Sequence, residues 1–141
     1  MTLKLDFLND ESGEGLARIP SNYMAESRLR IQAYRKIAQA EDLPTVKSLR
    51  REFRDRFGKI PRQLELLLQC AEVRIQASDA HVETVETRED KIMLTQHATL
   101  LQVGGKFPRF VETKPEGKLA ELKTLLHSLS ESVAPQAERK R

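Results

Sequence analysis

Between Pro44 and Pro61 the sequence reads PTVKSLRREFRDRFGKIP, and most of the fold prediction starts from this stretch. Its apolar residues recur every three or four positions, as on a helix with one buried face: Val46, Leu49, Phe53 and Phe57. Gly58 follows directly, where a left-handed helix cap favours glycine. Pro61 is suited to open a further helix. We therefore expect a helix that begins at Pro44 or Thr45, ends at Phe57 and is followed by a short joint.

The sequence on either side extends the helical pattern. Upstream, apolar residues that recur every four positions predict a helix over residues 25–40: Leu29, Ala33 and Ile37. Asp42-Leu43-Pro44 should end it. Downstream, a further apolar stripe predicts a third helix after Pro61: Leu64, Leu68, Ala71 and Ile75.

Strand patterns lie before and after these helices. Residues 3–7 alternate apolar and polar side chains with period two, as a half-buried strand does. Residues 82–87 and 91–95 are rich in β-branched residues and are separated by a turn, which predicts an antiparallel hairpin. Residues 99–103 add a further strand, which Gly104-Gly105 should end.

A last helix is predicted from Thr113 to Pro135. Thr113 and Glu116 have the spacing of a capping box. Apolar residues with heptad-like spacing follow: Leu119, Leu122, Leu126, Leu129 and Val133. This stripe suits a core, and in an isolated domain it also suits self-association. Pro135 should end the helix, and we expect residues 135–141 to form a disordered basic tail.

Together these elements predict an α+β fold. Three consecutive helices and a C-terminal helix should pack on a small antiparallel sheet, with residues 1–134 as one domain. The length of 141 residues is enough for one such core.

The composition is that of a globular protein, with 39% hydrophobic and 32% charged residues. The longest apolar runs, such as Leu66–Leu68, are far short of the roughly 20 residues of a membrane span. The N-terminus lacks the layout of a secretion signal. We therefore expect a cytoplasmic location and no contact with membranes. A single cysteine, Cys70, excludes an intrachain disulfide and a zinc site made of cysteines.

No catalytic, metal or cofactor site is expected. The three histidines fall in different predicted elements, without the i, i+4 spacing of a metal site on a helix: His81, His97 and His127. Cys70 lies on a leucine-rich helix, where a thiol is typically buried and inert. The sequence has neither a nucleophile elbow nor a phosphate-binding loop. A small enzyme would need a convergent polar pocket that these residues do not provide.

The second helix carries the most informative charges. At 100° per residue, one flank of its apolar stripe holds cations only: Lys47, Arg50 and Arg54. Glu52 and Arg56 fall on the other flank, and Asp55 points nearly away from the core. A solvated helix with surface ion pairs such as Arg51–Asp55 is one interpretation. Nucleic-acid contact through the cationic flank is another, although most of the net charge of +3 comes from the last four residues.

Three motifs resemble the C-terminal domain of the bacterial transcription-repair coupling factor. They are Arg18-Ile-Pro-Ser-Asn-Tyr-Met24, then Arg28-Leu-Arg-Ile-Gln-Ala-Tyr-Arg35, then Glu52-Phe-Arg-Asp-Arg-Phe-Gly-Lys-Ile-Pro61. The family has Ile-Pro-x-x-Tyr, Arg-Leu-x-x-Tyr-Arg and Glu-Leu-x-Asp-Arg-Phe-Gly-x-x-Pro in this order. The match covers about residues 3–80, and more loosely the hairpin and last helix. Phe53 stands where the family usually has leucine.

This resemblance implies a regulatory role. Full-length members are large ATP-driven DNA translocases that displace stalled RNA polymerase and recruit excision repair. This chain has no Walker or helicase motif, so the resemblance implies a non-enzymatic domain of a longer protein, ending at its natural C-terminus. In the family the domain docks on an N-terminal module that resembles UvrB and masks the surface that binds UvrA. UvrA and RNA polymerase would be indirect partners, and DNA would be bound mainly by other domains.

The resemblance also singles out three residues. Glu52, Asp55 and Arg56 occupy the Glu-x-x-Asp-Arg positions of the third motif, away from the centre of the apolar face. Our hypothesis is that they pair with opposite charges on the docking partner. Arg56 could instead form an internal salt bridge that fixes the turn at Gly58. The alternative function is a nucleic-acid-binding accessory domain, which would use the cationic flank and the basic tail: Lys47, Arg50 and Arg54.

Overall fold

In the computed structural model, which describes residues 1–9, 15–102 and 105–139, helix α2 spans Leu43–Phe57. It begins slightly before the predicted start because Asp42 caps it. The Asp42 Oδ1 atom accepts hydrogen bonds from the Thr45 backbone N at 2.8 Å and from Thr45 Oγ1 at 2.6 Å. Helix α2 ends at Phe57 as predicted, and Gly58 follows with φ 95° and ψ −166°. The predicted end of the helix is therefore confirmed, but the ψ of Gly58 lies outside the left-handed helical region, so the left-handed cap predicted there does not form.

The chain forms two compact units. One consists of residues 9–75, and the other combines residues 1–8 with residues 76–141. The predicted boundary between residues 134 and 135 stays a prediction. None of the described helices is long and apolar enough to cross a membrane.

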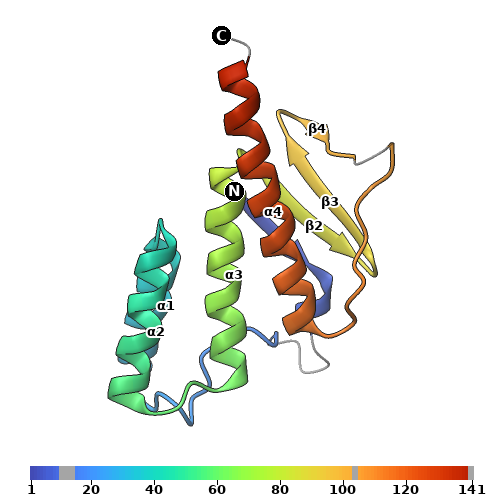
Figure 1. Ribbon diagram of the computed structural model, residues 1–141. Helices are drawn as coiled ribbons and strands as arrows, with labels where there is room; N and C mark the ends of the chain where they lie inside the picture. Colours follow the sequence, from blue (N-terminus) through green and yellow to red (C-terminus); the bar gives the residue numbers. More distant parts are fainter. Residues whose placement is uncertain (10–14, 103–104, 140–141) are drawn as a thin grey trace. The chain divides into compact units, whose positions relative to one another are not determined.

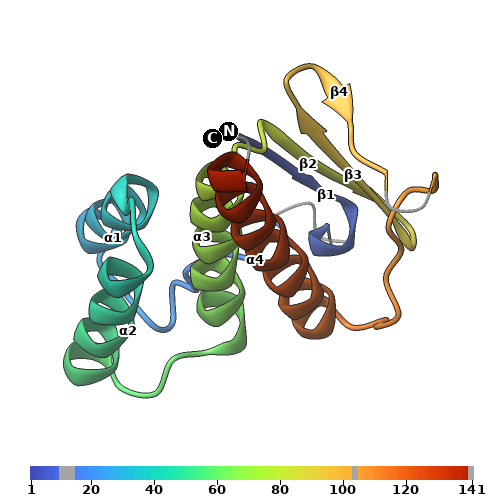
Figure 2. The same ribbon diagram turned by 45° about the horizontal axis from the view of Figure 1, so that its top comes forward.

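The unit of residues 9–75 is helical. It contains α1 (Ser27–Gln39), α2 and the greater part of α3 (Arg62–Asp79), so the three predicted consecutive helices are confirmed. Figures 1 and 2 show α1 and α2 side by side. Pro61 directly precedes α3, and its carbonyl accepts the Glu65 N–H at 3.0 Å. Residues from all three helices and from the segment before α1 share one core: Ile19, Met24, Ala33, Ile37, Ala40, Val46, Leu49, Phe53, Leu64, Leu68, Ala71 and Ile75.

The other unit contains a four-stranded sheet, within the described residues, in the order β1-β2-β3-β4. The strands span the following residues: β1 Thr2–Leu5, β2 Thr84–Arg88, β3 Lys91–Gln96 and β4 Thr99–Leu100. Strands β2, β3 and β4 are antiparallel, as predicted, with Val85 opposite Leu94. Strand β1, however, is parallel to β2, with Leu3 beside Val85.

The prediction of a purely antiparallel sheet was therefore wrong in one strand pair. Strands β1 and β2 are joined by the whole helical unit, and such a long connection allows parallel pairing where a hairpin does not. Strand β1 is also shorter than expected, because the chain turns into a short 3-10 helix at Asp6–Leu8. The Asp6 carboxylate holds this turn by accepting from Thr87 Oγ1 and from the Glu89 N–H, both at 2.8 Å. Strand β4 ends at Leu100, and Gly104 lies outside the described residues.

Helix α4 (Pro115–Arg139) lies along one face of this sheet (Figures 1 and 2). Its fully buried leucines are three of the predicted stripe: Leu119, Leu122 and Leu126. The Lys114 carbonyl accepts the Lys118 N–H at 2.9 Å, so Lys114 holds the cap position predicted for Thr113. The predicted α+β class is confirmed.

Helix α4 continues through Pro135 to Arg139, so the prediction that Pro135 ends the helix was wrong. A proline inside a helix removes one hydrogen bond, and the remaining bonds can carry the helix past it. Residues 140–141 lie outside the described residues. The disorder predicted for residues 135–141 stays a prediction.

Gly58→Ala tests the backbone at the end of α2. A Cβ at this position would meet no atom within 4 Å, so the whole cost is backbone strain at φ 95°. Such strain for a non-glycine residue is about 1–3 kcal/mol. Urea denaturation should show a free energy of unfolding lowered by that amount, whereas Lys59→Ala at the exposed next position should change it little. Equal effects of the two substitutions would contradict this account of the turn.

Candidate functional site on helix α2

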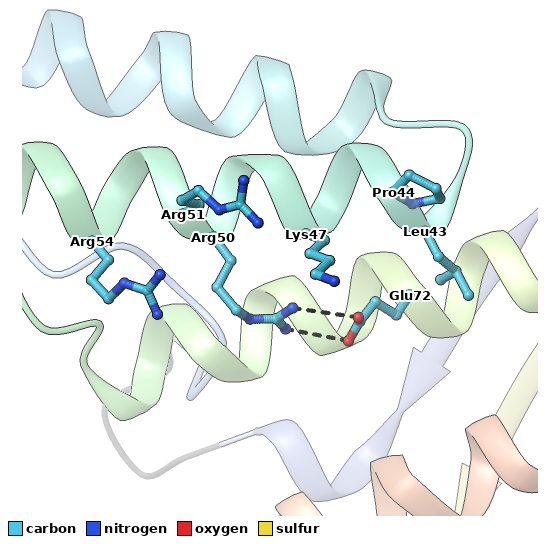
Figure 3. A pocket seen from close by; sticks show the side chains of 7 residues that line it. All are labelled: Leu43, Pro44, Lys47, Arg50, Arg51, Arg54 and Glu72. Carbon is cyan, nitrogen blue, oxygen red and sulfur yellow. Dashed lines mark hydrogen bonds and ion pairs between the residues drawn. The ribbon is translucent and has the colours of Figure 1, made fainter.

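A basic groove runs along one flank of α2 (Figure 3). Its volume is about 640 Å³. Six lining residues come from α2 and one from α3: Leu43, Pro44, Lys47, Arg50, Arg51, Arg54 and Glu72. The structure thus brings together the three cations predicted to share a flank, and it adds Arg51 to them. We call this site the basic groove.

Arg50 is the one groove cation whose charge is compensated by described acidic residues. Its Nε donates to Glu65 Oε2 at 3.0 Å and its Nη2 to Glu65 Oε1 at 2.9 Å. The same guanidinium contacts Glu72 through Nη2 at 3.3 Å and Nη1 at 3.5 Å. Both carboxylates come from α3, so the contact joins two helices of one unit.

The surroundings of Arg50 favour its charged form. Its side chain is 25% exposed, and that of Glu72 is 17% exposed. Burial by itself would lower the pKa of the Arg50 guanidinium, but hydrogen bonds and charge attraction from Glu65 and Glu72 outweigh it and raise the pKa. Arg50 therefore has a structural role at the edge of the groove.

The other three groove cations differ from Arg50. Lys47, Arg51 and Arg54 are exposed, and none of their side chains has a hydrogen bond or ion pair with any residue in the part of the chain that the structure describes. The ion pair expected between Arg51 and Asp55 is therefore absent there. Exposed side chains gain little free energy from such a pair and lose rotamer freedom when they form it. These three cations remain available to a ligand.

The motif residues Glu52 and Arg56 lie on another flank and interact within their own unit. The Lys36 Nζ and the Glu52 Oε2 atoms are 3.1 Å apart, and the Arg56 Nη1 atom is 3.6 Å from the same oxygen. The Arg56 guanidinium also lies 5.1 Å from the centre of the Phe57 ring. Asp55 differs, since it is exposed and has no partner among the described residues.

The turn at Gly58 is held by Tyr23, which the charge pattern did not indicate. The Tyr23 hydroxyl lies 2.7 Å from the Gly58 carbonyl oxygen and 3.0 Å from that of Phe53. Burial raises the pKa of this phenol, which keeps it protonated and able to donate. The internal salt bridge considered for Arg56 does form, but with Glu52, one helical turn back. The only sequence signal for Tyr23 was its place in the first motif.

Arg74 is a second residue that sequence reasoning missed. Its Nη2 donates to the carbonyls of Ile37 at 3.1 Å and Ala40 at 3.0 Å. These carbonyls lie at the end of α1, where carbonyls run out of helical donors. That of Ile37 also accepts the Ala40 N–H at 3.3 Å, and Arg74 supplies a further donor to both from α3. No local pattern in the sequence marks such a contact, because the two positions are far apart along the chain.

The described residues contain no group of three or more side chains suited to hold a metal ion. Burial raises the pKa of the Cys70 thiol to about 12, so the thiolate needed for nucleophilic chemistry is scarce at neutral pH. His81 and His97 both have positive φ, 61° and 53°, and lie at turns next to the strands.

The fold and this surface define a small α+β domain with a charged helical face. The model of the TRCF domain matches residues 15–101, more than half of the chain, so the chain belongs to the TRCF domain family. The predicted resemblance is confirmed.

Relatives and a solved structure agree with this assignment. The chain is 27% identical to a transcription-repair-coupling factor of Bacillus subtilis over 72% of its length, and 26% identical to that of Rickettsia bellii over 77%. It spans only 9% and 10% of these two relatives. A crystal structure of the C-terminal domain of a transcription-repair coupling factor has the same fold. Its TM-score is 0.67 at 20% identity, covering 92% of this chain and 94% of that one.

Single substitutions of the neighbouring residues Arg50 and Arg51 test whether Arg50 stabilises the domain and Arg51 does not. Arg50→Gln should lower the free energy of unfolding by about 1–3 kcal/mol, because Glu65 and Glu72 lose their shared donor. Arg51→Gln should change it by less than about 0.5 kcal/mol, since Arg51 has no described partner. Urea denaturation at low salt measures both. An equal loss in the two variants would show that the Arg50 contacts do not stabilise the helix pair.

Proposed function

We propose that this chain is a regulatory protein-interaction domain of a transcription-repair coupling factor. It docks on the N-terminal UvrB-like module of the full-length factor and masks that module's UvrA-binding surface until repair begins. UvrA and RNA polymerase are then indirect partners, and DNA is bound mainly by other domains. The role belongs to transcription-coupled DNA repair.

Membership of the TRCF family supports this proposal. The main structural support is that the charged residues of the third motif are free, or only weakly paired, within the domain. Asp55 is the motif charge without a partner in the described structure. Glu52 and Arg56 do interact, and Glu52 also pairs with Lys36, but the side chains remain accessible to solvent: 35% of Glu52 and 53% of Arg56 is exposed. Exposed ion pairs of this kind are weak and can exchange for pairs with another surface.

Such weakly paired charges suit a docking contact that must form and dissociate reversibly. Reversible contacts between domains are more polar than obligate ones, and complementary charges set their specificity and speed of association. In this arrangement Asp55 makes the new contact. Glu52 exchanges its pairs with Lys36 and Arg56 for the partner, and Arg56 is released to do the same.

Nucleic-acid binding is the second candidate function, and one observation favours it. Lys47, Arg50 and Arg54 converge on one groove, as a phosphate-binding surface requires. The compensation of Arg50 by Glu65 and Glu72 weakens this interpretation, because two carboxylates stand beside the site where a phosphate would bind.

Docking is tested by titrating this chain into the isolated N-terminal module of the same factor and measuring the heat of binding. Asp55→Arg should weaken the complex at least about tenfold, equivalent to about 1.4 kcal/mol, because it places a like charge against the partner's cation. Glu41→Arg is the matched control, since Glu41 is also an exposed acid without a described partner. This control should bind like the unchanged chain.

Either of two results would contradict the proposal: no complex with the unchanged chain, or equal affinity of the Asp55→Arg and unchanged chains. Thermal unfolding of both variants checks that folding is intact. Asp55 has no described partner, so the midpoint should move little.

A further inference from the structure

We infer that the basic groove is a second docking site, and that it binds an acidic segment of a protein. None of the motif residues Glu52, Asp55 and Arg56 lines this site, and the inference does not rest on the proposed function. Its occupant carries carboxylates in helical spacing next to an aliphatic side chain. Four observations on the groove and its walls support this chemistry.

The first observation is the charge balance. Four cations and a single carboxylate line the groove. The carboxylates of α3 that could have neutralised it, Glu65 and Glu72, are both bound to Arg50. Lys47, Arg51 and Arg54 therefore present unbalanced positive charge to solvent (Figure 3). Three neighbouring like charges on one helix flank repel each other, and an anionic ligand relieves this repulsion.

The second observation is spacing. Lys47, Arg51 and Arg54 stand at positions i, i+4 and i+7 of α2. At a rise of roughly 1.5 Å per residue, they extend over about 10 Å of one helix face. A partner helix with acidic residues at the same three intervals presents its carboxylates at the same pitch. Each carboxylate can then meet one cation.

The third observation is the aliphatic end of the groove. Leu43 is 37% exposed, and it lines the groove together with Pro44 at the start of α2. These side chains give a protein ligand an apolar group to cover. A nucleic acid backbone offers no aliphatic side chain that would bury them.

The fourth observation concerns what the groove lacks. No aromatic residue lines it, so bases would find no stacking surface. Glu72 forms part of the wall and would repel a phosphate that approached Arg50. Glu72 repels a carboxylate in the same way, so either anion would be directed to the three free cations; the lack of a stacking surface is what favours a protein ligand over a nucleic acid.

The test uses this chain and a fluorescein-labelled helical peptide with glutamates at positions i, i+4 and i+7 and a leucine at one end. Fluorescence anisotropy at low salt should show saturable binding that weakens as salt is added. The peptide with glutamines in place of the glutamates should bind at least about tenfold more weakly. The triple variant Lys47→Gln, Arg51→Gln, Arg54→Gln should lose peptide binding to a similar extent. It should still fold, because these residues have no described partners.

A matched variant removes the same charge elsewhere in the unit: Arg28→Gln, Arg35→Gln and Lys59→Gln, all exposed. This variant should bind the peptide normally, and so should Asp55→Arg, even if docking to the N-terminal module fails. The inference is overturned if the peptide does not bind, or if both triple variants lose affinity equally. It is also overturned if a duplex DNA of random sequence binds the groove more tightly than the peptide, with a steeper salt dependence.

Discussion

The functional surface depends on the hydrogen bonds that the Arg50 guanidinium donates to the carboxylates of Glu65 and Glu72. These bonds join the charged flank of α2 to α3 and satisfy one guanidinium with two carboxylates. Because that compensation is local, it leaves the neighbouring cations without acidic partners in the described structure. The buried apolar face of α2, with Phe53 1% exposed, fixes the orientation of the helix about its own axis, and this orientation turns Arg50 toward α3.

The α2 surface divides its charges between three uses. Arg50 stabilises the packing of α2 on α3. Glu52 and Arg56 form exchangeable pairs beside α1. Asp55 and the remaining groove cations face solvent without described partners. Such a division suits a domain whose work is contact with other protein surfaces, since binding can recruit the free charges without disrupting the core.

The sequence was sufficient for α1, α2 and α3, because their signals are local. For α4 it predicted that the helix exists but not its cap or its end. Asp42 and Pro44 mark the start of α2, Gly58 marks its end, and the apolar spacing between them sets its buried face. The parallel pairing of β1 with β2 could not be predicted in this way. It joins strands that are far apart in the sequence, with Thr2 beside Thr84, and alternation within a strand carries no information about the direction of its neighbour. The prediction that α4 ends at Pro135 was wrong because a helix can continue past a proline.

The candidate site was likewise predictable where its signals lie within one helix, and not where they join two helices. The helical periodicity correctly placed Lys47, Arg50 and Arg54 on one flank. It could not show that Arg50 is compensated, because Glu65 and Glu72 belong to another helix. The partner of Glu52 likewise comes from α1. The roles of the motif residues in docking and of the cations in binding stay predictions, because they concern molecules outside this chain.

The difference between Arg50 and its neighbours is most directly measured by NMR of the arginine side chains. The Nε–H of Arg50 donates to Glu65, so its signal should persist against exchange with water, and rotation about the Nε–Cζ bond should be slow. The Nε–H signals of Arg51 and Arg54 should exchange quickly and their guanidinium groups should rotate freely. If all three arginines exchange and rotate alike, the α2 surface does not separate a structural cation from free ones, and the account of this surface fails.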